Sequence, residues 1–240
     1  MKYIDVHCHL GSSVDGGKLS YDDLKQIVSD YPAEYVVVLP LDEAEKGGTY
    51  EKLNDEIKKT ADADDRLLWL GRINPHAGDR AVAEVERVIE AGASGIKLHP
   101  YSEDFGPGDA VNVFRKIGEL DVPVLLHSTH SVFTTEIDGW RRLFDSTGAP
   151  VIVAHGGKDG YRQLAGIADM HPNLFVDTTA VSTFRANYVY EAFGGDRIVY
   201  GSDLPYSHPG VERVKYDLIL KPEDREKVFY YNAAGIFGLA

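Results

Sequence analysis

Eight short apolar runs, rich in Val, Ile and Leu, alternate with longer amphipathic segments along the chain. The runs span residues 3–10, 35–40, 66–73, 95–100, 123–128, 150–157, 174–179 and 197–205. Near-continuous apolar character is typical of strands that are buried on both faces of a parallel sheet. The alternation therefore predicts an α/β fold built from repeated strand–helix units.

The segments between these runs carry the periodicity of amphipathic helices. Apolar residues at positions i, i+3 and i+4 predict helices at 21–30, 50–62, 80–93, 110–120 and 161–170, with weaker patterns at 137–147 and 185–194. The aromatic triplet at 229–231 predicts a further helix that packs against the sheet. Eight units in 240 residues fit a single (β/α)8 TIM barrel over residues 1–240. An open, doubly wound sheet of similar content is the alternative.

Composition excludes several classes of protein. Cys8 is the only cysteine, so a disulfide framework is excluded and a cytoplasmic location is favoured. Residues 1–10 lack the apolar core of a signal peptide, and no run approaches the roughly 18 apolar residues of a membrane span. The net charge of −13, without any Lys/Arg-rich run, argues against nucleic-acid or membrane partners. We therefore expect a small-molecule substrate.

The histidines cluster along the predicted strands. Eight of the nine lie at or just beyond the carboxyl ends of strands: His7, His9, His76, His99, His127, His130, His155 and His208. Only His171 falls in a connection that runs from a helix to a strand. Structural histidines would scatter over both ends of a barrel, whereas active sites of barrel enzymes lie at the carboxyl ends. The distribution indicates a functional site at that end.

The pair His7 and His9 has a direct geometric meaning. Side chains two residues apart on a strand point to one face, about 6–7 Å apart at their Cα atoms. Both imidazoles can therefore enter the barrel and share a cation, while Cys8 points to the helices. Alone, such a pair is more often two hydrogen-bonded polar core residues than a metal site. Ligand-type residues at later strand ends favour a metal site.

Asp203 and His155 are the strongest of these later candidates. Asp203 lies at the tip of the last strand, where a carboxylate can bind a metal and accept a proton from water. An ordinary turn aspartate or helix cap is its alternative interpretation. His155 precedes two glycines that allow a substrate or backbone to approach closely. A hydrogen-bonded core histidine is the alternative there.

Lys97 is unusual because it lies within an apolar strand, where an unpaired ammonium group is costly. Its side chain shares a face with that of His99. Three interpretations remain open: Lys97 pairs with an anionic substrate group, is carboxylated and bridges two metals, or forms an ion pair with a carboxylate such as Asp5. His99 could contact the substrate or position a metal ligand.

Taken together, the motifs resemble those of the amidohydrolase superfamily, in particular the amidohydrolase 2 group of compact barrels. The matching segments are IDVHCH (4–9), GIKLHP (95–100), PVLLHS (123–128), VIVAHGG (151–157), YGSDLPY (200–206) and NAAGIFGL (232–239). They occur in the family's order and span nearly the whole chain. The resemblance implies a distorted (β/α)8 barrel that holds one or two divalent metals, commonly zinc. The chain lacks the long insertions that shape substrate pockets in many relatives, which leaves the substrate open.

The resemblance also implies roles for individual residues. His7 and His9 match the first-strand ligands, His127 matches the fifth-strand ligand, and Asp203 matches the eighth-strand ligand and proton acceptor. His155 matches either a ligand of a second metal or a catalytic histidine. The group includes hydrolases, lactonases and non-oxidative decarboxylases, so the match does not fix the reaction.

We therefore expect a metal-dependent hydrolase that acts on an ester, lactone or amide of a small, anionic metabolite. Asp203, His155 and Lys97 would be catalytic. The predicted substrate contacts are His99, Arg185, Asn74 and Tyr206. The alternatives are a metal-dependent decarboxylase of an unsaturated or aromatic acid, and a catalytically silent barrel that binds a metal or metabolite. A homo-oligomer is compatible with all three.

Overall fold

The computed structural model describes residues 1–41, 48–128 and 133–239. Their strands form one nine-stranded sheet in the order β2-β1-β3-β4-β5-β6-β7-β8-β9. The strands are β1 (Ile4–Ser12), β2 (Lys18–Leu19), β3 (Tyr35–Pro40), β4 (Leu67–Arg72), β5 (Gly95–Leu98), β6 (Val124–Leu126), β7 (Val151–Val153), β8 (Leu174–Asp177) and β9 (Ile198–Val199). Each lies within or beside a predicted apolar run, apart from β2.

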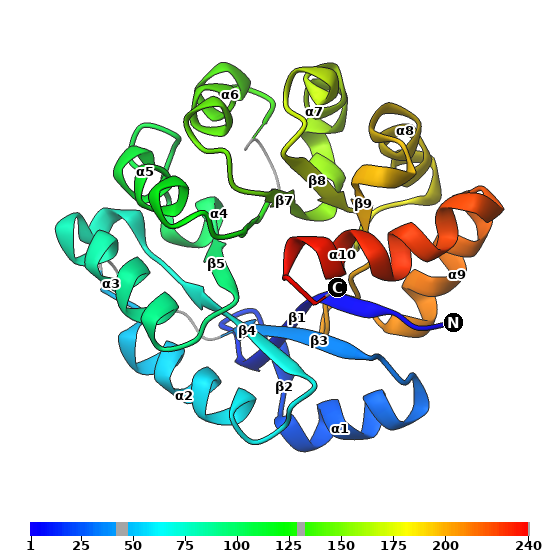
Figure 1. Cartoon of the computed structure of the whole chain (residues 1–240), viewed down its shortest axis with the longest axis horizontal. Helices are drawn as coiled ribbons and strands as arrows, with labels where there is room; N and C mark the ends of the chain where they lie inside the picture. Colours follow the sequence, from blue (N-terminus) through cyan, green and yellow to red (C-terminus); the bar gives the residue numbers. More distant parts are fainter. Residues whose placement is uncertain (42–47, 129–132, 240) are drawn as a thin grey trace.

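The sheet closes on itself. All neighbouring strands are parallel except β1 and β2, which form an antiparallel hairpin. The segment after β9 returns to β1: Val6 N donates to Tyr200 O at 3.0 Å, and His9 N donates to Leu204 O at 2.8 Å. A parallel bridge joins Cys8 to Leu204. β1 and β3 to β9 therefore form the predicted eight-stranded barrel, and the open doubly wound sheet is excluded (Figure 1).

Most helices surround the barrel on its outside, whereas α10 lies across one end of it (Figure 1). They are α1 (Tyr21–Asp30), α2 (Glu51–Ala61), α3 (Asp79–Glu90), α4 (Pro100–Glu103), α5 (Val111–Leu120), α6 (Ile137–Ser146), α7 (Tyr161–Gly166), α8 (Thr183–Phe193), α9 (Pro209–Ile219) and α10 (Asn232–Ile236). Short 3-10 turns are η1 (Pro75–Ala77), η2 (Ala154–Gly160), η3 (Ala168–Met170), η4 (Gly195–Arg197) and η5 (Pro222–Asp224), and η6 (Lys227–Tyr231) is a π-helical turn. The helix predicted at 161–170 is thus divided into α7 and η3.

Local signals explain individual boundaries. α1 begins at a capping box, in which the Ser20 side chain accepts from Asp23 N and the Asp23 carboxylate accepts from Ser20 N. The aromatic triplet predicted as helix forms the π-helical turn η6. Phe229 in this turn is fully buried, whereas Tyr231 is exposed.

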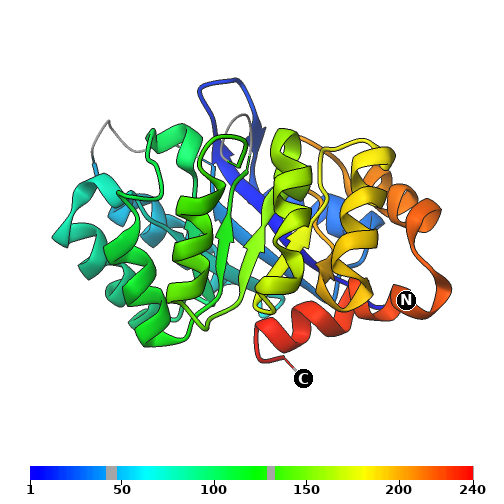
Figure 2. The ribbon, with the colours of Figure 1, turned by 90° about the horizontal axis from the view of Figure 1, so that it is seen from above.

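Two apolar cores lie on the two faces of the sheet. The core inside the barrel consists of Ile4, Val6, Val37, Leu39, Leu70, Leu125, Ile152, Ala154 and Val199, with Ala233 and Ala234 of α10. α10 lies at the end of the barrel opposite the β1–β2 hairpin and covers the amino-terminal ends of the strands (Figure 2). The larger outer core lies between strands and helices and includes Cys8. The carboxyl ends of the strands are left for the site.

Most strands end before the predicted limits, and two of these early ends shape the site. β5 ends at Leu98 and β7 at Val153, because the next residues leave the ladder to form α4 and η2. His99 caps α4, its Nδ1 accepting from Ser102 N. His155 lies within η2 in a left-handed conformation. Site residues that the pattern placed on strands therefore lie on the turns that follow them.

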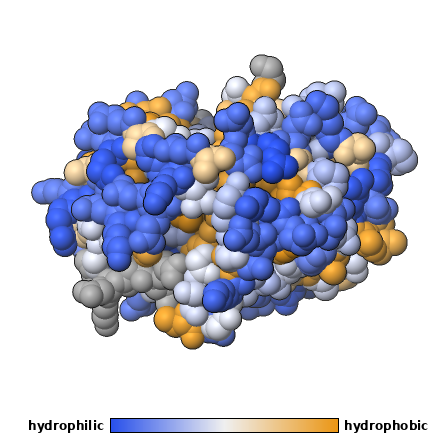
Figure 3. Space-filling view, turned by 90° about the horizontal axis from the view of Figure 1, so that it is seen from below, coloured by the Kyte–Doolittle hydropathy of each residue, from blue (hydrophilic) through white to orange (hydrophobic). Residues whose placement is uncertain are grey.

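α9 is polar on its inner side and apolar on its outer side. Glu212 and Lys215 are buried against the barrel, whereas Val211, Val214 and Leu218 are 63%, 58% and 72% exposed. The face of the molecule over α1 and α2 is mainly hydrophilic, with apolar atoms in separate spots (Figure 3). Among the helices in the described ranges, none is long and apolar enough to cross a membrane.

Candidate metal and active site

A β-bulge in β1 turns His7 into the barrel. Residues Ile4 and Val6 face the inner core, so strict alternation would place His7 on the outer face. Between Asp5 and Cys8, however, β1 carries one residue more than its partner β3. The extra residue shifts the alternation, and bulges of this kind commonly re-aim side chains near active sites. His7 and His9 consequently share the inner face, while Cys8 packs outward.

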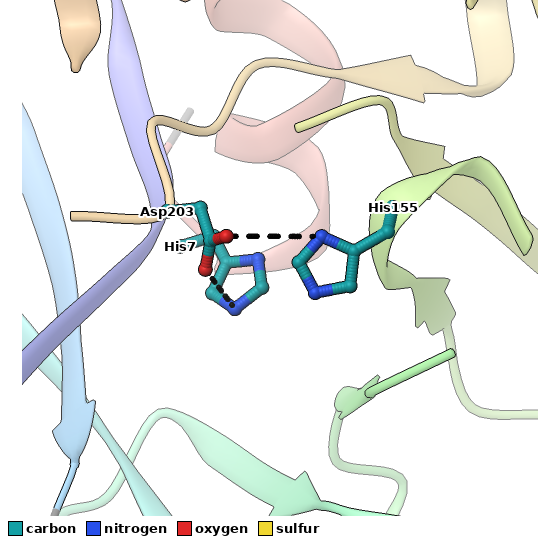
Figure 4. A group of neighbouring side chains, drawn as sticks. All are labelled: His7, His155 and Asp203. Atoms are coloured by element: carbon teal, nitrogen blue, oxygen red, sulfur yellow. Dashed lines mark ion pairs between the residues drawn. The ribbon is translucent and has the colours of Figure 1, made fainter. Parts of the chain in front are cut away.

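The carboxylate of Asp203 converges on three histidines. Nε2 of His7 and Nε2 of His9 are 3.1 Å apart, and they lie 3.5 and 3.3 Å from Asp203 Oδ1. His155 Nδ1 lies 3.9 Å from Asp203 Oδ2. Figure 4 shows His7, His155 and Asp203 pointing toward one another from opposite sides of the barrel. The ligand atoms of these three residues all lie within 4.8 Å of one another.

A second histidine pair lies beside this group. His155 Nε2 is 3.1 Å from His127 Nδ1. The ring of His127 stacks on that of His99, with centroids 3.6 Å apart and planes inclined by 15°. The stack limits the rotation of His127 and keeps its Nδ1 toward His155. Ligand-type nitrogens thus extend from β1 to the ends of β6 and β7.

These spacings fit a divalent cation. Two donors held 2.0–2.1 Å from one zinc ion at a tetrahedral angle lie about 3.3 Å apart. The His7–His9 and His127–His155 pairs are near that spacing, and imidazole and carboxylate donors suit zinc, manganese and related ions. His7, His9 and Asp203 form one candidate set, and His127 with His155 could hold a second ion.

The protonation states of the donors agree with this fit. Burial lowers the pKa of His9 to about 3 and that of His155 to about 4, so both imidazoles are neutral at pH 7. Burial alone would raise the pKa of Asp203, but His155 and His7 beside it hold that pKa below its usual range. A neutral imidazole with a free lone pair and an ionised carboxylate are the forms that bind metals.

Lys97 is fully buried on β5, where its Nζ lies 3.3 Å from His7 Nε2. Burial lowers the pKa of Lys97 to about 8, although Asp203 raises it. The Asp5 carboxylate instead accepts from the backbone N atoms of His7 and Ser202. Within the described residues no ion pair joins Lys97 to Asp5, so the geometry does not support that interpretation. Lys97 contacts His7 and does not line the cavity.

A cavity of about 440 Å³ opens above the histidines. Its lining residues are His9, Ser13, Val14, Asp15, Leu41, Arg72, His99, Tyr101, Ser102, His127, His155, Lys158, Ala180, Asp203 and Tyr206. Four of them, His155, Lys158, Ala180 and Asp203, have positive φ values between 41° and 58°. Left-handed backbone is costly for residues other than glycine and concentrates at functional sites. The strain therefore marks the same place as the donor atoms.

Nearly the whole chain matches the model of one protein family. The model described as Amidohydrolase matches residues 4–239. The chain belongs to the amidohydrolase family. No curated sequence matches this amidohydrolase significantly.

Solved structures share its fold at low sequence identity. A 2,6-dihydroxybenzoate decarboxylase from Rhizobium is 16% identical, with a TM-score of 0.74, and the match covers 99% of this chain and 98% of that one. A candidate 2-pyrone-4,6-dicarboxylic acid hydrolase from Pseudomonas putida is 16% identical, with a TM-score of 0.77 and coverage of 98% and 97%. A dihydroxybenzoic acid decarboxylase from Polaromonas sp., with bound manganese, is 15% identical, with a TM-score of 0.74 and coverage of 99% and 97%.

Two predicted substrate contacts of the amidohydrolase lie away from the cavity. Asn74 donates to Gly48 O at 3.0 Å and accepts from His76 N, which makes it a structural cap of η1. Arg185 of α8 forms an ion pair with Asp159 of η2, and the two charged groups are 3.1 Å apart. Neither residue lines the cavity, so the structure does not bring them to the site. Strand-tip position alone did not distinguish cavity residues from loop residues.

The other two predicted contacts, His99 and Tyr206, do line the cavity. The Tyr206 hydroxyl donates to Asp15 Oδ1 at 3.0 Å, and its ring meets His9 edge-on at 6.0 Å. Of the nine histidines, His130 lies outside the described residues.

Three further residues belong to the site but were not predicted from the sequence: Asp177, Thr179 and Arg72. Asp177 ends β8 and is fully buried, with its Oδ2 3.0 Å from His7 Nδ1. Arg72 ends β4, lines the cavity and donates to Glu103 at 2.6 Å. The available signal was a polar residue at the end of an apolar strand in LFVDTT and RLLWLGR. The same signal pointed to the histidines, Lys97 and Asp203, and to Asn74, Arg185 and Tyr206 as substrate contacts.

Proposed function

We propose that this amidohydrolase is a metal-dependent hydrolase of an ester, lactone or amide in a small, anionic metabolite. The observation that carries the proposal is the ionised Asp203 carboxylate, held against three histidines at the floor of the cavity. A divalent cation bound by His7, His9 and Asp203 would act as a Lewis acid and make water acidic enough to lose a proton near neutral pH. Asp203 would accept that proton.

The residues around Asp203 suit the remaining tasks. His155 lines the cavity beside Asp203 and is within reach of a substrate carbonyl, or of a second cation together with His127. Lys97 contacts His7. From there its ammonium group, or a carboxylated form of it, would influence the charge around the cation and would not contact the substrate. After proton transfer, a protonated Asp203 would deliver the proton to the leaving group. The same carboxyl group thereby serves both halves of the reaction.

The lining of the cavity supports a small, anionic substrate. A volume of about 440 Å³ suits a small metabolite. Lys158 lines the cavity, and within the described ranges it forms no ion pair. Arg72 lines it too, with its guanidinium held by Glu103. Lys158 rather than Arg185 is therefore our candidate contact for an anionic group, with His99 and Tyr206 beside it.

The test is Asp203→Asn, assayed by proton release with a panel of lactones and esters after loading with zinc. We expect turnover to fall at least about 100-fold, because general-base catalysis contributes roughly 10²–10⁴-fold. Asp145→Asn is the matched control, since Asp145 is an exposed partner of His171 remote from the cavity. If Asp203→Asn keeps turnover within a few-fold of the wild type, the hydrolase proposal fails.

A decarboxylase is the second candidate, favoured by the fold shared with two dihydroxybenzoate decarboxylases. The two reactions are separated by what they release. Hydrolysis of an ester or lactone forms a new acid and releases a proton, and hydrolysis of an amide forms an acid and an amine, whereas decarboxylation forms CO2 and consumes a proton. CO2 evolution from a panel of aromatic and unsaturated acids, without proton release from any ester or lactone, would establish this second activity. Membership in an enzyme family disfavours the catalytically silent barrel.

We propose zinc as the cation, one or two ions per chain, from the histidine-rich donor set. Manganese is the alternative cation, because it is bound in the Polaromonas decarboxylase. Metal analysis of the purified protein decides between them.

We also propose that residues 1–240 form one barrel domain, that the protein is cytoplasmic, and that it forms a homo-oligomer. Light scattering would measure the size of the oligomer.

A further inference from the structure

One carboxylate at the end of β8 reaches two histidines of the site. Asp177 Oδ2 lies 3.0 Å from His7 Nδ1. Asp177 Oδ1 accepts from His155 N at 3.1 Å, from Thr179 N at 2.9 Å and from Thr179 Oγ1 at 2.6 Å. Thr179 Oγ1 in turn lies 3.0 Å from His155 Nδ1. Asp177 and Thr179 are both fully buried.

Counting hydrogens fixes where each proton lies. Asp177 Oδ1 accepts from two backbone N–H groups and one hydroxyl, and hydrogen bonds of this kind favour the ionised form, so Asp177 is a carboxylate and can only accept. His7 Nδ1 must therefore carry a hydrogen. The single hydroxyl hydrogen of Thr179 goes to Asp177, so its oxygen can only accept from His155. His155 Nδ1 faces this oxygen and, at 3.3 Å, the Thr179 carbonyl, and must also carry a hydrogen.

We infer that Asp177 and Thr179 are positioning residues that fix both His7 and His155 in the Nδ1–H tautomer. In the neutral form, the lone pair of each ring then lies on Nε2. Nε2 of His7 faces His9, and Nε2 of His155 faces His127, at 3.1 Å in both cases. One buried carboxylate thus prepares lone pairs on both sides of the site, a task that outer carboxylates perform for metal-bound histidines.

The segment that carries Thr179 is itself held by the polar side of α9. Lys215 donates to Thr178 O, and Thr178 N donates to the Tyr216 hydroxyl at 3.2 Å. Ala180 N donates to Glu212 Oε1 at 3.2 Å. These bonds explain why α9 turns charged residues inward, and they keep the Thr179 hydroxyl in place between Asp177 and His155.

The first arm of the test is Asp177→Asn, read by imidazole ¹⁵N NMR on the metal-free chain. Three donors now point at Oδ1 of Asp177, and in the variant only the amide oxygen can accept from them. The amide NH2 group would therefore face His7. We expect His7 to change to the Nε2–H tautomer while His155 stays unchanged. Zinc affinity, measured by competition with a chromophoric chelator, should fall roughly 10–100-fold. The imidazole ¹⁵N resonances of His7 and His155 are assigned by their disappearance from the spectra of His7→Gln and His155→Gln, respectively.

The second arm uses Thr179→Val and Thr179→Ser. Valine removes the hydroxyl at nearly constant shape and leaves only the longer contact with the residue 179 carbonyl, at 3.3 Å, so His155 should change from a fixed Nδ1–H tautomer to a mixture of tautomers while His7 keeps its own. Serine restores the hydroxyl and should preserve the wild-type spectrum. If both histidines keep the Nδ1–H tautomer in Thr179→Val, or if Thr179→Ser behaves like Thr179→Val, the inference is wrong even where Asp177→Asn fails to fold.

The tautomer assignment is independent of the reaction, whereas its consequence for metal binding rests on the proposed function. NMR of the metal-free chain tests the first, and turnover of Asp203→Asn tests the second. An unchanged spectrum in the Asp177 and Thr179 variants overturns the positioning role alone. Retained turnover in Asp203→Asn overturns the hydrolase alone.

Discussion

At the scale of single residues, burial and backbone strain determine what the side chains of the site can do. Burial keeps His9 and His155 neutral, while histidines hold Asp203 ionised. The left-handed backbone of His155, Lys158 and Asp203 places three functional groups around one cavity. Such conformations persist only when surrounding structure holds them, and here the barrel ends provide that support. Geometry rather than residue type makes these groups a site.

The residue-scale prediction concerns Lys158. Lys158→Met should raise KM for an anionic substrate roughly 10- to 100-fold and leave kcat nearly unchanged, because a charged hydrogen bond of about 1.5–3 kcal/mol is lost from substrate binding. Steady-state kinetics measure both constants. Lys52→Met, on the exposed side of α2, is the matched control. An equal loss with a neutral ester would show that Lys158 supports the fold of the cavity instead of binding charge.

At the scale of elements, the strands are short and their ends are shaped by particular residues. The bulge in β1 aims His7, and the turns after β5 and β7 hold His99 and His155. β5 is also constrained at its start. A Cβ atom on Gly95 would lie 2.5 Å from Pro123 O of the neighbouring segment and 3.0 Å from Pro123 Cγ. Glycine therefore allows β5 and β6 to pair closely where the strands enter the barrel.

The element-scale prediction follows from that contact. Gly95→Ala should lower the free energy of unfolding by about 1–3 kcal/mol, since the backbone of residue 123 must move to admit the methyl group. Urea denaturation measures the change. Gly148→Ala is the control, because a Cβ atom there would meet nothing within 4 Å. Equal midpoints for the two variants would refute the steric explanation.

At the scale of the whole molecule, the barrel separates stability from function. α10 lies at one end of the barrel, opposite the β1–β2 hairpin (Figure 2). The inner apolar core includes residues of α10, whereas the histidines, Asp203 and the cavity lie at the carboxyl ends of the strands. Several polar groups that would be costly to bury without partners are gathered at the open end. Cations bound there would draw ligands from β1 and the segment after β9 in one set, and from the ends of β6 and β7 in the other. Metal binding should therefore stabilise the closed barrel as a unit.

The prediction at this scale is a thermal shift on metal removal. At a free zinc concentration about 100 times Kd, binding stabilises the fold by about 2.7 kcal/mol. Chelation should then lower Tm by roughly 5–10 °C for a chain of this size. Differential scanning calorimetry measures the shift. Asp203→Asn should show a smaller shift than the wild type, and an unchanged Tm on chelation of the wild type would argue against a site that joins these strands.

The amino-acid pattern alone was enough to predict the barrel and the end at which its site lies. Buried parallel strands require continuous apolar runs, and a closed ring places all their carboxyl ends together, so strand-end histidines and Asp203 could be grouped from their positions in the chain. The remaining features came from the folded molecule. The bulge that turns His7 inward, the contact of Asp177 with His7, and the places of Lys158 and Arg185 depend on atoms from strands far apart in the chain. A residue's distance from a cavity is a property of the closed barrel, and no local pattern encodes it.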